Sequence, residues 1–390
     1  MDGLKEKSIL ILTHTLVRGA AQELEDYLIA KKVKTLLFIG NPLTYGYGRK
    51  TQETATEVKL YRRGILAHHR KSSDYKLPPL LKYVENMLRN IFYAFSSKEK
   101  FDLMIGVDNL NAFSCLILKL FGRGRVSVFY TIDYFRKGRF KSRIMDCLYF
   151  FMDKLCVVHS DIVWNVSPRM LEGREEKGLS SYFRGKQITV PIGISKDKDT
   201  RLGTSDRYRV IFLGNIAEES GAPLLLDSAR EIIINVPLAN FLFIGGGAFE
   251  DRAKKIVREQ GLGGKVKFMG VVRERKNLEE VLSSGGIGLA LYKPTDENHT
   301  YFADPTKPKD YLAMGIPLVI TDVPLVAREI SLKGAGILIK YDKAELIKAL
   351  CLLLTDDQFY LKARDNALSL SNDYSWSNIF DNAFRRIDYE

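Results

Sequence analysis

The residue best placed to do chemistry is a lysine at the start of an expected helix. The stretch 304–319 (DPTKPKDYLAMGIPLV) leaves a polar loop, enters a short helix at Lys307 and exits through Gly-Ile-Pro into a buried strand. The dipole and free N–H groups of a helix N-terminus favour an anion, and a lysine adds a mobile positive charge. Asp310 lies three residues on, on the same helix face, where it could accept hydrogen bonds from a ribose diol. The pattern indicates a nucleoside diphosphate site, although an exposed Lys–Asp pair on a surface helix has the same spacing.

Two glycine turns could approach the same ligand. Leu213-Gly214-Asn215 ends one expected strand, and Gly245-Gly246-Gly247 directly follows another. Glycine allows backbone conformations that are closed to other residues, and it brings free N–H groups close to a ligand. Glycine turns of this kind are as often tight connections without a ligand as they are ligand-binding turns. Because the spacing is not GxGxxG, nothing indicates a nicotinamide cofactor.

The first half of the chain carries its own candidates at strand ends. Asp133 follows an expected strand over 125–131, where a carboxylate could take a proton from an acceptor hydroxyl. A helix-capping aspartate, or one that forms a salt bridge with Arg136 or Lys137, explains this position equally well. The loop after the first strand carries His14, which could orient a hydroxyl, and Arg18-Gly19. A lone histidine at a strand end is more often structural.

Metal and disulfide chemistry have little support in the sequence. The triplet Asp197-Lys198-Asp199 lies in a polar stretch, where a solvated loop is the better explanation than a cation site. The histidines form no HExxH or similar pair. The four cysteines are widely spaced and form no CxxC. We therefore expect no metal site and no disulfide scaffold.

Short β-branched runs alternate with helical patterns along the whole chain, which is typical of parallel α/β units. A helix is expected after Pro78-Pro79, because apolar residues recur at helical spacing through Phe95. We expect two tandem Rossmann-like, doubly wound domains that face an interdomain cleft. The expected boundaries are 1–192 for the first domain, 193–207 for a polar linker, 208–372 for the second domain and 373–390 for a terminal helix that could pack back on the first domain. The expected strands are 8–13, 34–39, 103–107, 125–131, 162–166, 187–191, 209–213, 241–244, 266–269, 287–291, 318–321 and 337–339.

The charge balance favours anionic partners. The chain of 390 residues has 59 Lys+Arg against 47 Asp+Glu, a formal net charge of +12. Basic residues concentrate in 62–76 and in 136–143, where aromatic residues are interleaved, and this pattern favours an anionic membrane surface. No signal-peptide core and no uninterrupted run of ~20 apolar residues is found, so we expect a cytoplasmic protein that is peripheral on the inner face of the plasma membrane. A solvated basic surface without a specific partner is the plain alternative, and no nucleic-acid motif is present.

Around Lys307 and the glycine turns, the chain resembles the GT-B glycosyltransferases, specifically the family called glycosyl transferases group 1 or family 4-like. PTKPKDYLAMGIPLVITD is similar to the donor-site pattern of that family. The resemblance extends to VIFLGNIAEESGAPLLLDSA, FLFIGGGAFEDRAKK, KVKFMGVV, ITVPIGIS, WNVSPRM and YSWSNIF. It covers the second domain and the end of the first. The donor-site residues that it implies are Gly214, Asn215, Gly245, Gly246, Lys307, Asp310 and Tyr311. The loop with His14, Arg18 and Gly19 resembles the flexible glycine loop that contacts the donor or acceptor in this fold.

The chain departs from the family pattern at three places. The first of two acidic donor-site residues falls on Phe302, and Asp304 or Glu297 could substitute for it. The Arg and Lys that relatives often carry in the first turn of the second domain are Asn215 and Ser220 here. The His-Asp pair of the first domain reads Ile132-Asp133, so the imidazole is missing and the carboxylate remains.

The resemblance implies an enzyme that transfers a sugar from a nucleotide-diphosphate sugar to a hydroxyl acceptor without a metal or other cofactor. A lipid-linked acceptor or a cell-surface glycan precursor fits the basic charge. A non-catalytic α/β binding protein that keeps the fold is the alternative, with the residues at 132 and 302 as marks of lost catalysis. An epimerase or phosphorylase on the same double fold is a third interpretation.

Overall fold

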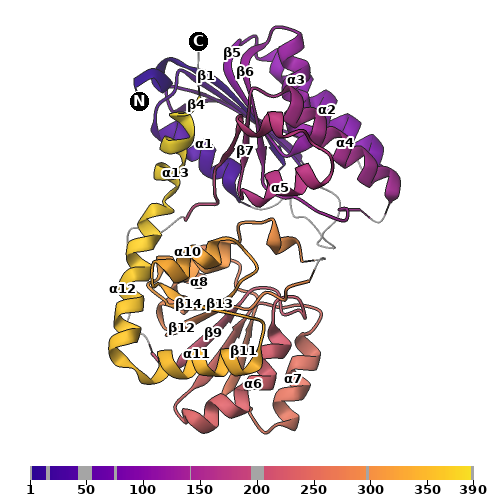
Figure 1. Cartoon of the computed structure of the whole chain (residues 1–390). Helices are drawn as coiled ribbons and strands as arrows, with labels where there is room; N and C mark the ends of the chain where they lie inside the picture. Colours follow the sequence, from indigo (N-terminus) through magenta and orange to yellow (C-terminus); the bar gives the residue numbers. More distant parts are fainter. Residues whose placement is uncertain are drawn as a thin grey trace. The chain divides into compact units, whose positions relative to one another are not determined.

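The chain folds into two compact units, each built around one sheet (Figure 1). The computed structural model describes residues 2–14, 18–42, 55–73, 77–140, 142–194, 206–295 and 298–387. The first unit contains Met1–Pro191 and Trp376–Glu390, and the second unit contains Ile192–Ser375. The terminal segment thus groups with the first unit, and most of the expected linker, 195–205, lies outside the described residues.

The sheet of the first unit has the strand order β4-β3-β2-β1-β5-β6-β7-β8. Neighbouring strands are parallel except for the antiparallel pairs β2–β3 and β3–β4. The order reverses between β1 and β5, and the ends of strands beside such a reversal are where open α/β sheets bind ligands. The strands are β1 (Ser8–His14), β2 (Thr35–Asn41), β3 (Ala55–Arg62), β4 (Ile65–Ser73), β5 (Phe101–Val107), β6 (Gly124–Thr131), β7 (Ile162–Asn165) and β8 (Gln187–Thr189).

The hairpin β3–β4 was not predicted from the sequence. Its strands meet at Arg63 (φ 52°) and Gly64 (φ 83°), and two successive positive φ angles with glycine second are typical of a tight hairpin turn. β4 forms the edge of the sheet and is exposed along nearly its whole length, so it lacks the alternation of apolar and polar residues that marks a half-buried strand.

Helices cover both faces of this sheet (Figure 1). α2, α3 and α4 lie on one face, where Leu10 and Met104 pack against Ala94 and Cys115. α1 and α13 lie on the other face, where the rings of Tyr27 and Phe384 stack with centroids 5.7 Å apart. The helices are α1 (Ala20–Ala30), α2 (Pro79–Ser96), α3 (Asn109–Leu120), α4 (Arg143–His159), α5 (Arg169–Glu176) and α13 (Trp376–Phe384), with 3₁₀ turns at Asp2–Glu6 and Ser181–Arg184.

The sheet of the second unit is parallel throughout, with the order β11-β10-β9-β12-β13-β14. The order reverses between β9 and β12. Their residues are almost all buried, as expected for a sheet covered on both faces. The strands are β9 (Arg209–Leu213), β10 (Asn240–Ile244), β11 (Val266–Gly270), β12 (Ile287–Ala290), β13 (Leu318–Thr321) and β14 (Gly336–Ile339).

Two apolar clusters hold the helices of the second unit to its sheet. One packs α6, α7 and α11 against one face, and the other packs α8, α9 and α10 against the opposite face. Side-chain caps begin α11 and α12, where Asp342 and Asp356 each accept a backbone N–H at 2.9 Å. The helices are α6 (Ala222–Asn235), α7 (Glu250–Glu259), α8 (Arg275–Ser283), α9 (Thr306–Ala313), α10 (Val326–Leu332), α11 (Lys343–Thr355) and α12 (Asp357–Asp373), with a 3₁₀ turn at His299–Tyr301.

Within the described part of the chain, every helix is too short or too polar to cross a membrane.

Candidate functional site

Lys307 is the second residue of α9, and its side chain crosses the turn that ends β9. The nearest backbone is Gly214, where a Cβ atom would overlap the end of the lysine side chain. Gly214 also has φ +109°, a conformation that residues with a side chain rarely adopt. Glycine is therefore required at this position both by backbone geometry and by the space that Lys307 occupies.

Among the residues that the structure describes, the ammonium of Lys307 has no counter-ion in hydrogen-bond contact. No acceptor among the described residues forms a hydrogen bond or ion pair with its Nζ atom. Burial lowers the pKa of Lys307 to about 8, against a smaller opposing effect from nearby Asp310. The group is still mostly protonated at neutral pH. A partly buried cation beside a helix N-terminus and without a partner is a ready site for an anionic ligand.

The two predicted glycine turns touch each other. A Cβ on Gly245 would overlap the carbonyl oxygen of Gly214, so the turn after β10 packs directly on the turn after β9. The N–H groups of Gly214 and Gly245 donate within the sheet, at 2.7 Å to Ile244 O and 2.7 Å to Gly270 O. The expectation that these two amides are free for a ligand is therefore wrong.

The backbone N–H groups of the next two residues, Gly246 and Gly247, differ from those of Gly214 and Gly245. In the described part of the chain, the N–H groups of Gly246 and Gly247 donate to no protein acceptor. Asn215 is exposed, and its Oδ1 atom lies close to Gly247. The turn after β10 thus offers two amide donors and the β9 turn offers an exposed side chain.

Asp310 lies one helical turn after Lys307 and forms an ion pair with α8. Its Oδ1 atom is 2.5 Å from the guanidinium of Arg275, which also binds Glu279 at 2.7 Å. Burial raises the pKa of Asp310, and Arg275 opposes that rise. Among the described residues, no donor is bonded to its Oδ2 atom, which leaves this oxygen able to accept a ligand hydroxyl.

Tyr311 was predicted to contact the donor, and this prediction is wrong for its side chain. The side chain is fully buried, its hydroxyl donates to Ile211 O at 2.9 Å, and its ring lies directly under Gly288. Adjacent helix residues point about 100° apart, so Asp310 and Tyr311 face different surroundings. Tyr311 ties α9 to β9 and β12 and contributes to the core.

Asp304 does not replace the missing acid at Phe302. Its carboxylate accepts the N–H of Ile192 at 2.7 Å and binds the Lys309 ammonium at 2.5 Å, and all these groups are buried. Phe302 itself is buried, with 3% of its surface exposed. Glu297, the other substitute considered, lies outside the described residues.

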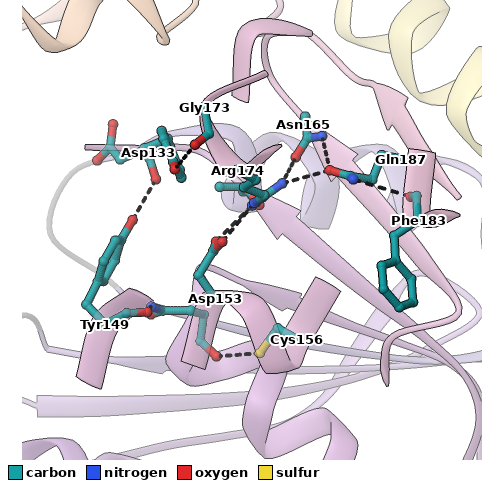
Figure 2. Close-up of polar contacts among 12 residues, drawn as sticks. Asp133, Tyr149, Asp153, Cys156, Asn165, Gly173, Arg174, Phe183 and Gln187 are labelled. Carbon is teal, nitrogen blue, oxygen red and sulfur yellow. Dashed lines mark hydrogen bonds and ion pairs between the residues drawn. The ribbon is translucent and has the colours of Figure 1, made fainter. Parts of the chain in front are cut away.

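In the first unit, the predicted Asp133 lies just after β6. Tyr149 donates its hydroxyl to the backbone carbonyl of Asp133 at 3.1 Å, and the carboxylate points away from the neighbouring polar cluster (Figure 2). Arg136, a candidate partner in the structural interpretation, instead pairs with Glu176 at 3.0 Å. The structure thus places Asp133 at the carboxyl end of a central strand.

Asp108 is a second carboxylate at this edge, and it was not predicted from the sequence. It follows β5 directly and has φ +66°, a strained conformation for a residue other than glycine. Burial raises the pKa of Asp108 to about 6, and the nearby Asp133 adds to this rise while Arg139 opposes it. The signal that could have revealed it is the one used for Asp133, an aspartate immediately after a buried strand.

His14 completes this edge at the end of β1. The amide nitrogen of Asn111 donates to Val107 O at 2.8 Å and lies 3.2 Å from the Nδ1 atom of His14. Because that nitrogen is a donor, Nδ1 must accept, and the imidazole carries its proton on Nε2. Burial, with a smaller effect from Arg139, lowers the pKa of His14 to about 4. His14 is neutral near pH 7 and can donate one hydrogen bond from Nε2.

A buried cluster around Arg174 fixes the segment that follows Asp133 (Figure 2). Arg174 binds both carboxylate oxygens of Asp153, at 2.8 and 2.9 Å, and reaches Thr131 at 2.7 Å and Asn165 at 2.7 Å. Tyr134 donates its hydroxyl to Gly173 O at 2.7 Å. These contacts connect α4 and α5 to the ends of β6 and β7, so they hold the backbone that carries Asp133.

Arg18 and Gly19 were predicted to form a ligand loop with His14. Arg18 instead pairs with Glu23 at 2.9 Å and with Asp26, both on α1. Gly19 is the N-cap of α1, and its N–H donates to Gln22 Oε1 at 2.9 Å. Residues 15–17, between them and His14, lie outside the described residues.

In the ranges that the structure describes, no group of three or more His, Cys, Asp or Glu side chains is arranged to hold a metal ion. The triplet 197–199 lies outside these ranges.

Both units are doubly wound and carry candidate residues at the carboxyl ends of their strands, which defines the GT-B class of glycosyltransferase folds. Residues 207–356 match the model of the family described as glycosyl transferases group 1. The match covers most of the second unit, which is therefore similar to the glycosyltransferases of this family. No curated protein matches it in sequence.

Solved structures with the same fold cover nearly the whole chain. A sucrose-phosphate synthase from Thermosynechococcus elongatus has a TM-score of 0.68 at 16% identity, over 97% of this chain and 99% of that one. HepE from Anabaena, in complex with UDP, has a TM-score of 0.69 at 13% identity, over 97% of this chain and 98% of that one. The catalytic domain of starch synthase IV from Arabidopsis thaliana, bound to ADP and acarbose, has 0.68 at 11% identity, over 98% and 99%.

Proposed function

We propose that the protein transfers a sugar from a nucleotide-diphosphate sugar to a hydroxyl group of an acceptor. The observation that carries this proposal is the partly buried Lys307 ammonium, which has no counter-ion in contact among the described residues and lies over Gly214 at the start of α9. A nucleoside diphosphate supplies the missing negative charge.

Lys307 would act mainly on the leaving group. When the bond between the sugar and the diphosphate breaks, negative charge develops on the diphosphate oxygen. A cation already positioned there stabilises that charge without reorganisation, which is usually the largest single contribution to catalysis. The amides of Gly246 and Gly247 can add hydrogen bonds, and the Oδ2 atom of Asp310 can accept from the ribose. No divalent metal is needed in this scheme.

The first unit would bind and activate the acceptor. Asp133 is our candidate general base, with Asp108 as the second carboxylate beside it. The base takes the proton of the acceptor hydroxyl, the oxygen forms the new bond to the anomeric carbon, and the old bond to the diphosphate breaks. His14 can orient the hydroxyl through its Nε2 proton. Burial raises the pKa of Asp108 to about 6, so Asp108 is the alternative group to accept a proton near neutral pH.

The donor class is supported by relatives of the same fold. HepE is described with UDP and with UDP-glucose, and starch synthase IV with ADP. The acceptor we propose is lipid-linked or a glycan precursor at the cell surface, reached from the cytoplasmic face of an anionic membrane. The net charge of +12 supports this acceptor class.

The test measures donor binding by calorimetry and thermal shift against a panel of nucleotide sugars, UDP and ADP. Lys307→Ala should weaken nucleoside diphosphate binding by about 1.5–3 kcal/mol, the range for hydrogen bonds to charged groups. Lys333→Ala, an exposed lysine of the same unit, should bind like the wild type. Equal affinity of wild type and Lys307→Ala, with the fold intact, would show that the donor site is elsewhere.

The alternative, a binding protein without activity, has one specific observation in its favour. Phe302 is buried where relatives carry an acid, and Asp304 is already neutralised by Lys309. This alternative predicts nucleotide-sugar binding without transfer to any acceptor and without slow hydrolysis of the donor.

A further inference from the structure

Helix α2 packs against the first unit with its polar side. The residues that face inward are Lys82, Asn86, Asn90 and Ala94, spaced four apart, and each is at most 3% exposed. Helices on the surface of a globular protein normally bury their apolar stripe and expose the polar one. α2 does the opposite.

The apolar side of α2 faces outward. Leu88 is 57% exposed and Phe92 is 61% exposed. The stripe continues at its end onto the turn after α3, where Phe121 is 68% exposed and its ring lies 6.2 Å from that of Phe95. We call this surface the α2 stripe, and its members are Leu81, Val84, Leu88, Phe92, Phe95 and Phe121.

Buried hydrogen bonds fix the helix in this orientation. Asn90 accepts from Asn41 at 2.7 Å and donates to Asn111 at 3.0 Å and to Ser114 at 3.2 Å. Rotating α2 to bury its apolar side would break this network and leave buried amides unpaired, at a cost of about 1–3 kcal/mol for each group. The exposed stripe is therefore a stable feature of the fold.

Two arginines flank the α2 stripe on different elements. The Arg70 guanidinium, on β4, lies 5.9 Å from the ring centre of Tyr93, and that of Arg123 lies 5.1 Å from the ring centre of Phe95. Within the described residues, neither arginine forms an ion pair. The only acid of α2, Glu85, is paired with Lys82 and Arg89. The stripe thus has an apolar centre and positive edges.

We propose that the α2 stripe is the surface on which this enzyme docks peripherally on an anionic lipid bilayer. A bilayer matches both properties, because acyl chains accept the leucine and phenylalanine side chains and headgroup phosphates accept the arginines. The proposal deepens the proposed function only in its membrane-linked acceptor, and it is independent of the donor site.

This surface includes Arg70 of the basic segment 62–76 singled out in the sequence, but it excludes the other basic segment, 136–143. In 136–143, Arg136 is neutralised by Glu176, and Arg139 acts on the electrostatics of Asp108 and His14 inside the candidate site. The free positive charge that a membrane needs is better supplied by Arg70 and Arg123.

The test is co-sedimentation of the full chain with vesicles of phosphatidylcholine, alone and mixed with phosphatidylglycerol. The wild type should bind the mixed vesicles, and the double variant Leu88→Ser/Phe92→Ser should bind at least about tenfold more weakly. Arg70→Glu/Arg123→Glu should lose the preference for anionic vesicles, and raising salt should imitate that loss. Leu332→Ser removes a leucine that is 87% exposed in the second unit and should bind like the wild type.

Two results would overturn the proposal. One is equal sedimentation of the wild type and Leu88→Ser/Phe92→Ser. The other is a concentration-dependent increase in mass without vesicles that the double variant abolishes, because it would assign the stripe to a second copy of the chain. UDP and ADP binding, measured on the same variants, should be unchanged, so a failure of the donor site is distinguishable from a failure of the membrane surface.

Discussion

Both sheets reverse their strand order beside their first strand, but the two units carry different chemistry at the strand ends there. In the second unit, the strand ends beside the reversal of strand order carry glycine turns and a lysine. In the first unit, the equivalent strand ends carry a neutral imidazole and two carboxylates. Topology decides where a ligand can bind, and the residues at the strand ends decide which ligand and what chemistry.

The units also differ at their outer surfaces. The second unit has a parallel sheet whose two faces are closed by apolar clusters. The first unit extends its sheet with the antiparallel hairpin β3–β4 and covers it with the polar side of α2. One unit resembles a self-contained module, and the other leaves an apolar surface open to a partner.

The largest expected effect tests the assignment of base chemistry to the first unit. Asp133→Asn should lower turnover by about 10²- to 10⁴-fold, the usual contribution of a positioned proton transfer, and should leave donor affinity unchanged. The measurement is single-turnover sugar transfer alongside calorimetric donor binding. Asp108→Asn, tested in parallel, decides between the two carboxylates. Normal turnover in both variants would contradict the assignment of base chemistry to the first unit.

The next effect is on stability and tests whether the Arg174 cluster is what holds the first unit's site. Arg174→Met leaves Asp153 buried without its partner and should lower the free energy of unfolding by about 3–5 kcal/mol, measured by urea denaturation. Arg184→Met breaks the exposed pair with Glu175 and should cost less than about 1 kcal/mol. Similar losses in the two variants would contradict a special role for the buried cluster.

A smaller effect concerns pH and sharpens the role of the second unit. The pKa of Lys307 is lowered to about 8 in the free protein, so its charge is present below that pH and is lost above it. Nucleoside diphosphate affinity should therefore fall as pH rises through about 8, by at most tenfold per pH unit. Lys307→Ala should bind weakly with no such step. A flat calorimetric profile for the wild type between pH 7 and pH 9.5 would remove the lysine from the binding site.

The smallest effect distinguishes ribose from diphosphate recognition. Asp310→Asn keeps an acceptor oxygen but weakens the pair with Arg275, so nucleoside diphosphate affinity should fall by about 1 kcal/mol. Inorganic pyrophosphate, which has no ribose, should bind the variant as it binds the wild type. Equal losses for both ligands would place Asp310 near the phosphates.

The core of the fold could be predicted from the sequence because buried parallel strands are continuous apolar runs. The strand expected over 209–213 coincides with β9, and that over 318–321 coincides with β13. β3 and β4 were missed, since an exposed edge strand needs no apolar pattern. The composition of α2 predicted a helix correctly, but which of its sides is buried depends on Asn41, Asn90 and Asn111, which come together only in the folded chain.

The candidate site was likewise predictable only where it depends on local sequence. Lys307 and Asp310 lie in the first turns of a helix, as predicted, because a helix N-terminus and a spacing of three are local properties. The amides of Gly214 and Gly245 are occupied by neighbouring strands, which no local pattern reveals. Asp108 was missed although its position after β5 is local, because nothing in its sequence neighbourhood resembles a motif.

The overlap between Gly214 and Lys307 limits which sequences can keep this site. Any residue with a side chain at 214 would have to displace the lysine, so the two positions can vary only together. A single base change that turns this glycine codon into one for alanine, serine or valine would remove the cation from its place while leaving the sheet beneath it intact. Among natural or laboratory variants, we expect substitution at position 214 to lower stability, because φ there is +109°, and to lower activity as well, because the lysine is displaced.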